Sequence, residues 1–213
     1  MASQDLEVSL CKETEACRSE TDASDSLPDP SLWWVNKVKR HLSGNPRPPP
    51  PKTPRDLLSG CTASGADIMV MKALGIPFTC VGTSEPEAKY REFQASNHGG
   101  CIEHMHLTLS DQTAETPCEM HPDSCGCKVG RGHSLAVLGC PCPPYSVMRQ
   151  KRRVNGSVQE HPHHQVMFCD SVERLQKHAP VSVILEQVCG FDEPECKDSS
   201  CTSLQRPGFA EVV

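Results

Sequence analysis

The feature that most constrains the fold of this chain is a series of short apolar runs separated by helical patterns. Residues 134–139 and 181–185 are apolar almost throughout, with no alternation of polar and apolar side chains. Such runs are typical of parallel strands that are buried on both faces. Three further strands are predicted at residues 56–60, 78–82 and 101–109, and helices at 68–74, 84–97 and 165–178. The alternation predicts an α/β fold in which helices cover both faces of a parallel sheet.

The first part of the chain has a different composition. Residues 1–54 are rich in Ser, Asp, Glu and Pro, and they include the proline run 46–51. We predict a disordered Pro-rich tail over 1–54 and a folded domain over 55–213. Within the tail, the apolar stretch Leu32–Val35 is either a partner-binding segment or a stray hydrophobic turn.

Composition narrows the cellular compartments and the classes of partner that are expected for the protein. The 14 cysteines follow an acidic N-terminus with no signal-peptide pattern, so we expect reduced thiols in an intracellular compartment. No stretch approaches the roughly 18 apolar residues of a membrane span, and we expect no membrane association. The net charge of −6 argues against a uniformly basic nucleic-acid binder but leaves room for a local basic patch.

Residues capable of chemistry follow each predicted strand. In open parallel sheets, ligands bind beyond the carboxyl ends of the strands. Cys142 lies in a stiff turn of prolines, Pro141–Pro144, and basic residues follow it closely. A thiol in this setting is a candidate nucleophile. The residues that follow the strands, in chain order, are Ser59, Gly60, Glu85, Asp111, Cys142 and Glu186.

Four segments, taken in order, resemble motifs of the cytosine-5 DNA methyltransferase family. Asp56–Gly60 is similar to the family's Asp-Leu-Phe-Ser-Gly cofactor loop, and Ser84–Glu85 to its Ser-Glu before the second helix. Pro141–Ser146 is similar to the Pro-Cys-Gln-x-Phe-Ser nucleophile loop, and Glu186–Val188 stands where the family has Glu-Asn-Val. The resemblance implies a Rossmann-like, S-adenosylmethionine-dependent methyltransferase sheet.

The resemblance also implies roles for single residues. Cys142 would attack carbon 6 of cytosine, and Glu186 would hydrogen-bond at ring nitrogen 3, so that carbon 5 accepts the methyl group of S-adenosylmethionine. For Glu85, an ordinary acid at a helix N-terminus is a competing interpretation. The residues implied for the cofactor are Ser59, Gly60, Glu85 and Asp111.

A basic segment follows the candidate nucleophile, where the family's mobile loop meets DNA. We expect it to contact phosphates of DNA, or of a tRNA with the same chemistry, and we expect a nuclear location. A solvated loop or a nuclear-localisation patch is the alternative. The candidate nucleic-acid contacts are Ser146, Arg149, Lys151, Arg152 and Arg153.

The chain also departs from the family. Thr62 stands where the cofactor loop has its second glycine, and Gln187 replaces the Asn that braces the nucleophile loop. The family's later motifs are not found before Val213, so the resemblance covers residues 56 to about 192. We therefore expect a partial catalytic domain, incomplete at its C-terminus. Strand 181–185 would then be an apolar sheet edge that a partner chain could cover.

One loop carries zinc-type ligands, namely Cys118, His121, Cys125 and Cys127, with His133 nearby. The spacing is not that of a standard zinc finger, so an unliganded loop is favoured and no metal is predicted. Three functions remain open: a cytosine-5 methyltransferase, an inactive methyltransferase-like fragment that binds nucleic acid or a partner protein, and an unrelated zinc-binding module.

Overall fold

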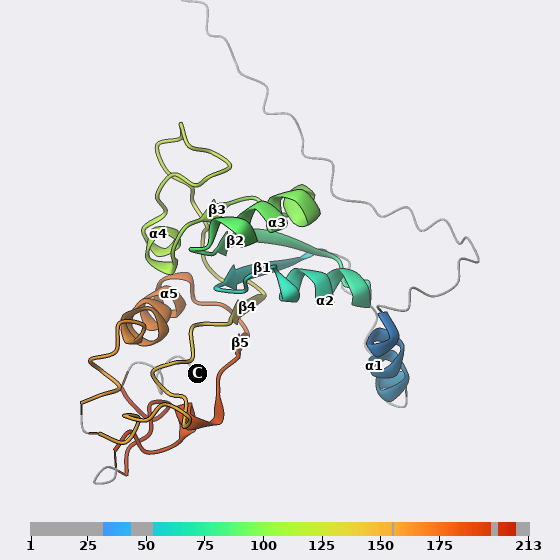
Figure 1. The fold of residues 1–213 in the computed structure, drawn as a ribbon. Helices are drawn as coiled ribbons and strands as arrows, with labels where there is room; N and C mark the ends of the chain where they lie inside the picture. The colour runs from blue at the N-terminus through green and yellow to red at the C-terminus, as the bar shows by residue number, and fades with distance from the viewer. Residues whose placement is uncertain (1–31, 44–52, 155, 197–199, 208–213) are drawn as a thin grey trace, which may run out of the picture.

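The protein folds around a five-stranded parallel sheet with the strand order β3-β2-β1-β4-β5 (Figure 1). The computed structural model describes residues 32–43, 53–154, 156–196 and 200–207. All four pairs of neighbouring strands are parallel. The strands are β1 (Arg55–Gly60), β2 (Phe78–Ser84), β3 (Met105–His106), β4 (Leu135–Leu138) and β5 (Val183–Leu185).

Helices cover both faces of the sheet. Helix α2 packs on one face, and α4 and α5 pack on the other, while His98 of α3 contacts Gly65 beside the start of α2. The helices are α1 (Trp33–Ser43), α2 (Ala66–Leu74), α3 (Ala88–His98), α4 (Leu109–Ala114) and α5 (Ser171–His178). Shorter helical turns are η2 (Gly99–Cys101), η3 (Gln165–Asp170, a π-helical turn) and η4 (Cys189–Asp192).

Two adjacent leucines of β1 show how the sheet is buried. Leu57 and Leu58 are both fully buried, but they belong to different apolar clusters. Leu57 packs with residues of α2, and Leu58 packs with Leu109 of α4 and Leu175 of α5. Successive side chains of a strand point to opposite faces, so a continuous apolar run is what a sheet covered on both sides requires.

The predicted fold class is confirmed at the level of an α/β protein with a parallel sheet flanked by helices. The third strand is shorter than predicted: within 101–109 only Met105–His106 form it, with one isolated bridge between Cys80 and Ile102. Gly75 ends α2 as predicted, in the left-handed conformation at φ 69°, and donates its N–H to the Lys72 carbonyl at 3.0 Å.

Other local predictions were wrong. Helix α4 lies in a segment that we had taken as strand and loop, and it begins where the Thr108 hydroxyl accepts the Asp111 N–H. The helical spacing of Tyr90 and Phe93 predicts that they form the buried face of α3, but both are exposed; the buried residues of the helix are Gln94 and His98.

Most of the predicted tail lies outside the described residues. Within it, α1 is an amphipathic helix whose Val35 is 3% exposed, and α1 contacts α2. Each described helix is too short or too polar to cross a bilayer.

Candidate functional site

The strand order reverses between β1 and β4, and this point organises the candidate site. Chain connections from β1 run toward β2 and β3, whereas β4 and β5 lie on its other side. The point between β1 and β4 is therefore a topological switch point, the place at the carboxyl edge of a parallel sheet where ligands commonly bind. The candidate residues of both loops, with Glu85 after β2 and Glu186 after β5, are brought to this edge.

The loop after β1 is folded tightly on itself. Cys61 and Ala63 have φ values of 53° and 48°, in the left-handed region that favours glycine. Thr62, at the position where the family has glycine, does not; its hydroxyl instead lies 2.6 Å from the Ser59 hydroxyl. Left-handed conformations in non-glycine residues cost roughly 1 kcal/mol each and often occur at functional sites.

Glu85 joins this loop to α3. It directly follows β2, is 5% exposed, and accepts the Ala63 N–H at 3.1 Å and the Glu87 N–H at 3.0 Å. Ser84 and Glu87 have the spacing of a capping box, but Ser84 is the last residue of β2 and no side-chain hydrogen bond caps α3. Glu85 thus supports the start of α3, as the competing interpretation proposed, while it also faces the loop after β1.

Gly60 and Asp111 have clear packing roles. A Cβ atom on Gly60 would lie 2.7 Å from Cδ2 of Leu109, so glycine allows α4 to approach the end of β1. The Asp111 carboxylate accepts the Thr108 hydroxyl at 2.7 Å, in the first turn of α4.

Two charged residues near Ser59 at the end of β1 were not predicted from the sequence to be part of the site. Asp67, in the first turn of α2, has no hydrogen-bond partner for either carboxylate oxygen within the described part of the chain. Burial raises the pKa of this carboxyl, and the nearby Ser59 hydroxyl lowers it only in part. The partly buried Asp67 carboxylate therefore lies beside the hydroxyls of Ser59 and Thr62, in the loop after β1.

The second is Arg174 of α5, which is 0% exposed. It donates to Oε1 of Gln112 at 2.6 Å and to the Ser59 carbonyl at 3.0 Å, while its Nη1 has no hydrogen-bond partner among the described residues. Burial lowers the pKa of Arg174 to about 10, so the guanidinium remains charged at neutral pH. No sequence signal marked this residue, because arginine at a helical position is usually exposed.

The candidate nucleophile lies in an anchored turn after β4. Cys142 carries a free, half-buried thiol, and its carbonyl accepts the N–H groups of Tyr145 at 3.0 Å and Ser146 at 3.1 Å. Tyr145 is fully buried and packs edge-on against Phe191, with ring centroids 4.8 Å apart. The turn is therefore held in place from both of its ends.

Glu186 begins the neighbouring segment. Its N–H donates to the Leu138 carbonyl at 2.9 Å, which places it beside the end of β4, and its side chain is exposed. The next residue, Gln187, donates its amide to the Cys140 carbonyl at 3.2 Å, so the longer side chain does reach the nucleophile loop. Among the described residues, no hydrogen bond joins the Cys142 thiol to the Glu186 carboxylate.

The prediction that Arg152 contacts phosphates is corrected by the structure. Arg152 is 1% exposed and donates to the carbonyls of Tyr145 at 3.1 Å, Gly190 at 2.7 Å and Glu195 at 2.7 Å. It clamps the nucleophile loop to the segment after β5. A buried guanidinium that is committed to carbonyls cannot also bind a phosphate.

The other basic residues are divided. Arg149 donates to Pro144 and Ser157, and Arg153 pairs with Glu193 and donates to the Pro194 carbonyl at 2.9 Å. Arg149 and Arg153 therefore stabilise the conformation of the loop. Lys151 and Arg153 are exposed and Ser146 is half-buried, so these three remain accessible candidates for nucleic-acid contact.

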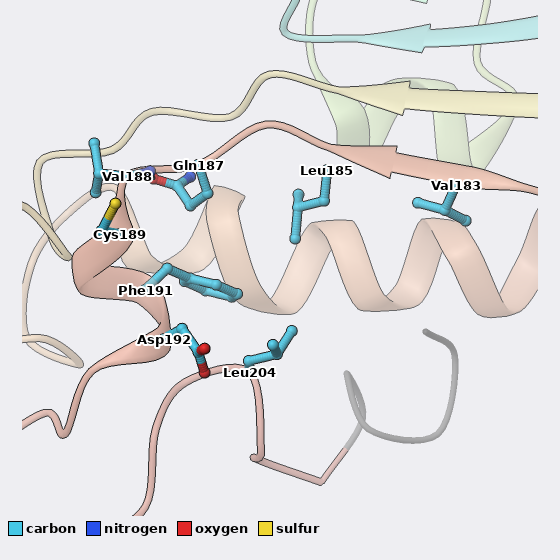
Figure 2. A pocket seen from close by; sticks show the side chains of 8 residues that line it. All are labelled: Val183, Leu185, Gln187, Val188, Cys189, Phe191, Asp192 and Leu204. Carbon is cyan, nitrogen blue, oxygen red and sulfur yellow. Dashed lines mark hydrogen bonds between the residues drawn. The ribbon is translucent and has the colours of Figure 1, made fainter.

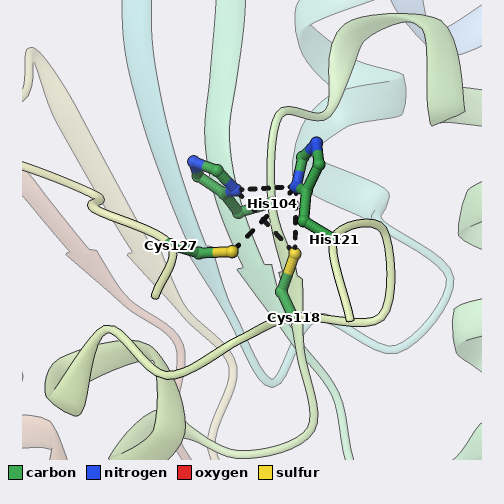
Figure 3. A group of neighbouring side chains, drawn as sticks. All are labelled: His104, Cys118, His121 and Cys127. Carbon is green, nitrogen blue, oxygen red and sulfur yellow. Dashed lines mark hydrogen bonds between the residues drawn. The ribbon is translucent and has the colours of Figure 1, made fainter. Parts of the chain in front are cut away.

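A second cluster lies off the β3 edge (Figure 3). His104, Cys118, His121 and Cys127 present one ligand atom each, all within 4.8 Å of one another. Of the zinc-type residues noted in the sequence, Cys125 is exposed and outside the cluster, and His133 lies elsewhere, 6.1 Å from the His178 ring. His104 was missed because it precedes β3, far from the loop in sequence.

A pocket of about 370 Å³ lies beside β5 (Figure 2). Most of its lining is apolar, and it includes Val183 and Leu185 of β5 and Phe191 of η4. The remaining lining residues are Gln187, Val188, Cys189, Asp192 and Leu204.

No protein-family model matches this chain, and no curated protein matches its sequence at a significant level. A function is therefore inferred from the α/β fold, from the residues at the carboxyl edge of the sheet and from the His/Cys cluster.

Proposed function

We propose that this chain is a methyltransferase-like protein that transfers a methyl group from S-adenosylmethionine to carbon 5 of cytosine through a covalent adduct on Cys142. One observation carries the proposal: the loop with Cys142 and the segment with Glu186 are fixed to each other. Gln187 bonds the Cys140 carbonyl, and Arg152 joins the carbonyls of Tyr145 and Gly190. Two reactive groups on adjacent, mutually fixed loops are what concerted acid and nucleophile chemistry requires.

The chemistry assigns a distinct step to each residue. The Cys142 thiolate forms a bond to carbon 6, and Glu186 donates a hydrogen bond or proton at ring nitrogen 3, so electron density moves to carbon 5. Carbon 5 then takes the methyl group that the sulfonium of the cofactor supplies. A base removes the carbon-5 proton, the double bond re-forms and the thiolate leaves, which restores Cys142.

Several polar groups fit S-adenosylmethionine. The cofactor carries an ammonium, a sulfonium and two ribose hydroxyls. The Asp67 carboxylate lies beside the Ser59 hydroxyl, and each Glu85 oxygen accepts one backbone N–H, which leaves further lone pairs for hydroxyl groups. Ser59 and Gly60 would border the methionine part of the cofactor, and Asp111 the adenine.

For the nucleic acid, the accessible candidates are Lys151, Arg153 and Ser146, which follow the candidate nucleophile. A cytosine in a duplex must leave the stack to reach Cys142, at a cost of a few kcal/mol. DNA is the substrate that we propose, with tRNA as the alternative that offers the same ring. A nuclear, reducing location follows from this proposal.

A second candidate is an inactive methyltransferase-like fold that binds nucleic acid or a partner protein. One observation favours it: within the described residues, the Glu186 side chain is exposed and makes no hydrogen bond to Cys142. Activity requires the Glu186 carboxylate to turn toward the bound base.

Methyl transfer from labelled S-adenosylmethionine to cytosine-containing DNA and to tRNA separates these candidates. We expect label in DNA with the unchanged chain, none with Cys142→Ser, and unchanged incorporation with Cys169→Ser, which removes an exposed thiol elsewhere. Binding of the cofactor without transfer to either nucleic acid would support the inactive fold, and transfer that survives Cys142→Ser would contradict the proposal.

A further inference from the structure

We propose that His104, Cys118, His121 and Cys127 bind one Zn²⁺ ion. The two sulfurs and two ring nitrogens converge on a common point from the start of β3 and from the loop after α4 (Figure 3). Two thiolates and two imidazoles in a closed set of four are a typical ligand set for structural zinc.

The three distances among His104 Nδ1, His121 Nδ1 and Cys118 Sγ are close to those of a tetrahedron around zinc, and Cys127 Sγ lies slightly farther out. With Zn–N near 2.0–2.1 Å and Zn–S near 2.3 Å, tetrahedral angles require about 3.3 Å between nitrogens and about 3.6 Å between nitrogen and sulfur. The Nδ1 atoms of His104 and His121 are 3.3 Å apart. Cys118 Sγ lies 3.4 Å from His121 Nδ1 and 3.8 Å from His104 Nδ1. Cys127 Sγ lies 4.0 Å from His121 Nδ1.

The burial of the cluster suits a structural ion. Cys118 and Cys127 are 3% and 2% exposed, His104 is half-buried and His121 is exposed. The four residues supply a complete coordination shell, which leaves no open position for a substrate. Two thiolates also balance the charge of the ion.

The surrounding loop needs such a support. Residues 115–134 connect α4 to β4 without a regular helix or strand, and connections of this length are uncommon in compact domains. The loop buries only a few side chains, and its two buried cysteines are both ligands. An ion that joins Cys118, His121 and Cys127 to His104 would tie this loop to the sheet.

The ion would also support the candidate site. The His104 carbonyl accepts the Thr83 N–H at 2.8 Å, and the His106 carbonyl accepts the Glu85 N–H at 3.1 Å. From the other side, Glu119 donates its N–H to the Met105 carbonyl at 2.9 Å. The metal cluster therefore lies against the same short strand that positions Glu85.

The test is elemental analysis of the purified full chain, together with cobalt substitution. We expect one zinc per chain, and after exchange a visible absorption spectrum of tetrahedral Co²⁺ with thiolate ligands. His104→Ala and Cys118→Ser should each lose the zinc. Cys125→Ser is the matched control, because Cys125 lies in the same loop but outside the cluster.

If the alanine or serine variants fail to fold, His104→Cys keeps the test informative, since it replaces one zinc ligand by another and should retain the metal. A wild-type chain that holds no zinc and shows no thiolate-bound cobalt spectrum would overturn the proposal. A Cys125→Ser variant that loses the metal while His104→Ala retains it would also overturn it.

Discussion

The two edges of the sheet are managed in different ways. At one edge, β3 is only two residues long, and the loop 115–134 lies against it through the His/Cys cluster. At the other edge, Ile184 of β5 is 54% exposed, and Val183 and Leu185 border an apolar pocket. Short strands and covering loops protect a sheet edge, whereas an apolar open edge is a site of association.

The difference shows where this chain supplies its own cover and where it does not. The β3 edge is held by four side chains that we propose to bind an ion, and the β5 side is held by hydrogen bonds from Arg152 and Gln187. The candidate nucleophile lies between the two edges, on the loop after β4. Hydrogen bonds from Gln187 and Arg152 hold its loop at the β5 side, whereas the His106 carbonyl holds Glu85 at the β3 side.

Removal of the metal is expected to have the largest effect on stability. Loss of a structural metal belongs to the few changes that cost more than about 4 kcal/mol. Cys118→Ser should therefore lower the free energy of unfolding strongly, as measured by denaturant titration in the presence of zinc. Cys125→Ser should change it by less than about 0.5 kcal/mol. Equal effects of the two substitutions would break the comparison at the β3 edge.

Loss of the Arg152 hydrogen bonds is expected to have the second-largest effect on the free energy of unfolding. Arg152→Met leaves buried carbonyls at Tyr145, Gly190 and Glu195 without their donor. We expect a loss of about 3 kcal/mol in unfolding free energy. Arg153→Met is the control, because its ion pair with Glu193 is exposed and contributes about 1 kcal/mol or less. If Arg152→Met were as stable as Arg153→Met, the hydrogen bonds of Arg152 would not be what stabilises the β5 side.

A smaller effect on stability is expected from a change of pH. It arises in the C-terminal part of the loop 115–134, which lies outside the proposed metal site. His178 of α5 lies with its Nδ1 2.7 Å from the Gly130 carbonyl, and burial lowers the pKa of its imidazole. The folded state therefore binds fewer protons than the unfolded state just below the ordinary imidazole pKa of about 6.5. The stability that the neutral ring contributes is present above that pH and is lost as pH falls below it.

Thermal melting of the wild type and of His178→Gln between neutral and mildly acidic pH measures this effect. The wild type should lose more stability on acidification than the variant. Parallel pH profiles would exclude His178 as the source.

A still smaller effect is expected between the two edges, in the loop after β1. Ala63 has a φ of 48°, which glycine adopts without strain. Ala63→Gly should stabilise the fold by about 0.5 kcal/mol, since relief of strain exceeds the added entropy of the unfolded chain. A matched Ala66→Gly substitution, at the start of α2, should instead destabilise it. Denaturant titration of both variants checks the opposite signs.

The smallest effect on stability is expected at the open edge. Ile184→Lys should leave the unfolding free energy within about 0.5 kcal/mol, because the side chain is largely exposed. The same substitution should reduce self-association, measured by light scattering over a range of concentrations, because a charge on an edge strand disfavours pairing. Association that is unchanged by the lysine would mean that β5 is not the site of contact.

The sheet was predictable because continuous apolar runs report burial on both faces, and all five strand positions were found. The third strand was overestimated, and α4 was missed because its polar sequence Leu-Ser-Asp-Gln-Thr-Ala shows no apolar periodicity. The prediction of which face of α3 is buried was wrong for a related reason. Gln94 is buried because its amide donates to the Ala63 carbonyl, a contact that no local pattern reveals.

The candidate site was predictable only as far as chain order allows. Residues directly after strands reach one edge by topology, and this argument placed Cys142 and Glu186 on adjacent segments. The sequence could not predict that Arg152 and Arg174 are buried, because no pattern gives a reason for an arginine to be buried. It also could not find His104, whose partners lie beyond α4 and come close only in the folded chain.

The central claim is that Cys142 forms a covalent bond to cytosine, and trapping tests it most directly. In DNA that contains 5-fluorocytosine, methyl transfer leaves no proton on carbon 5, so the adduct cannot resolve. With S-adenosylmethionine present, we expect a DNA-linked protein whose digest places the bond on Cys142, and no such species with Cys142→Ser. An adduct on another cysteine, or no adduct with a chain that binds both cofactor and DNA, would contradict the claim.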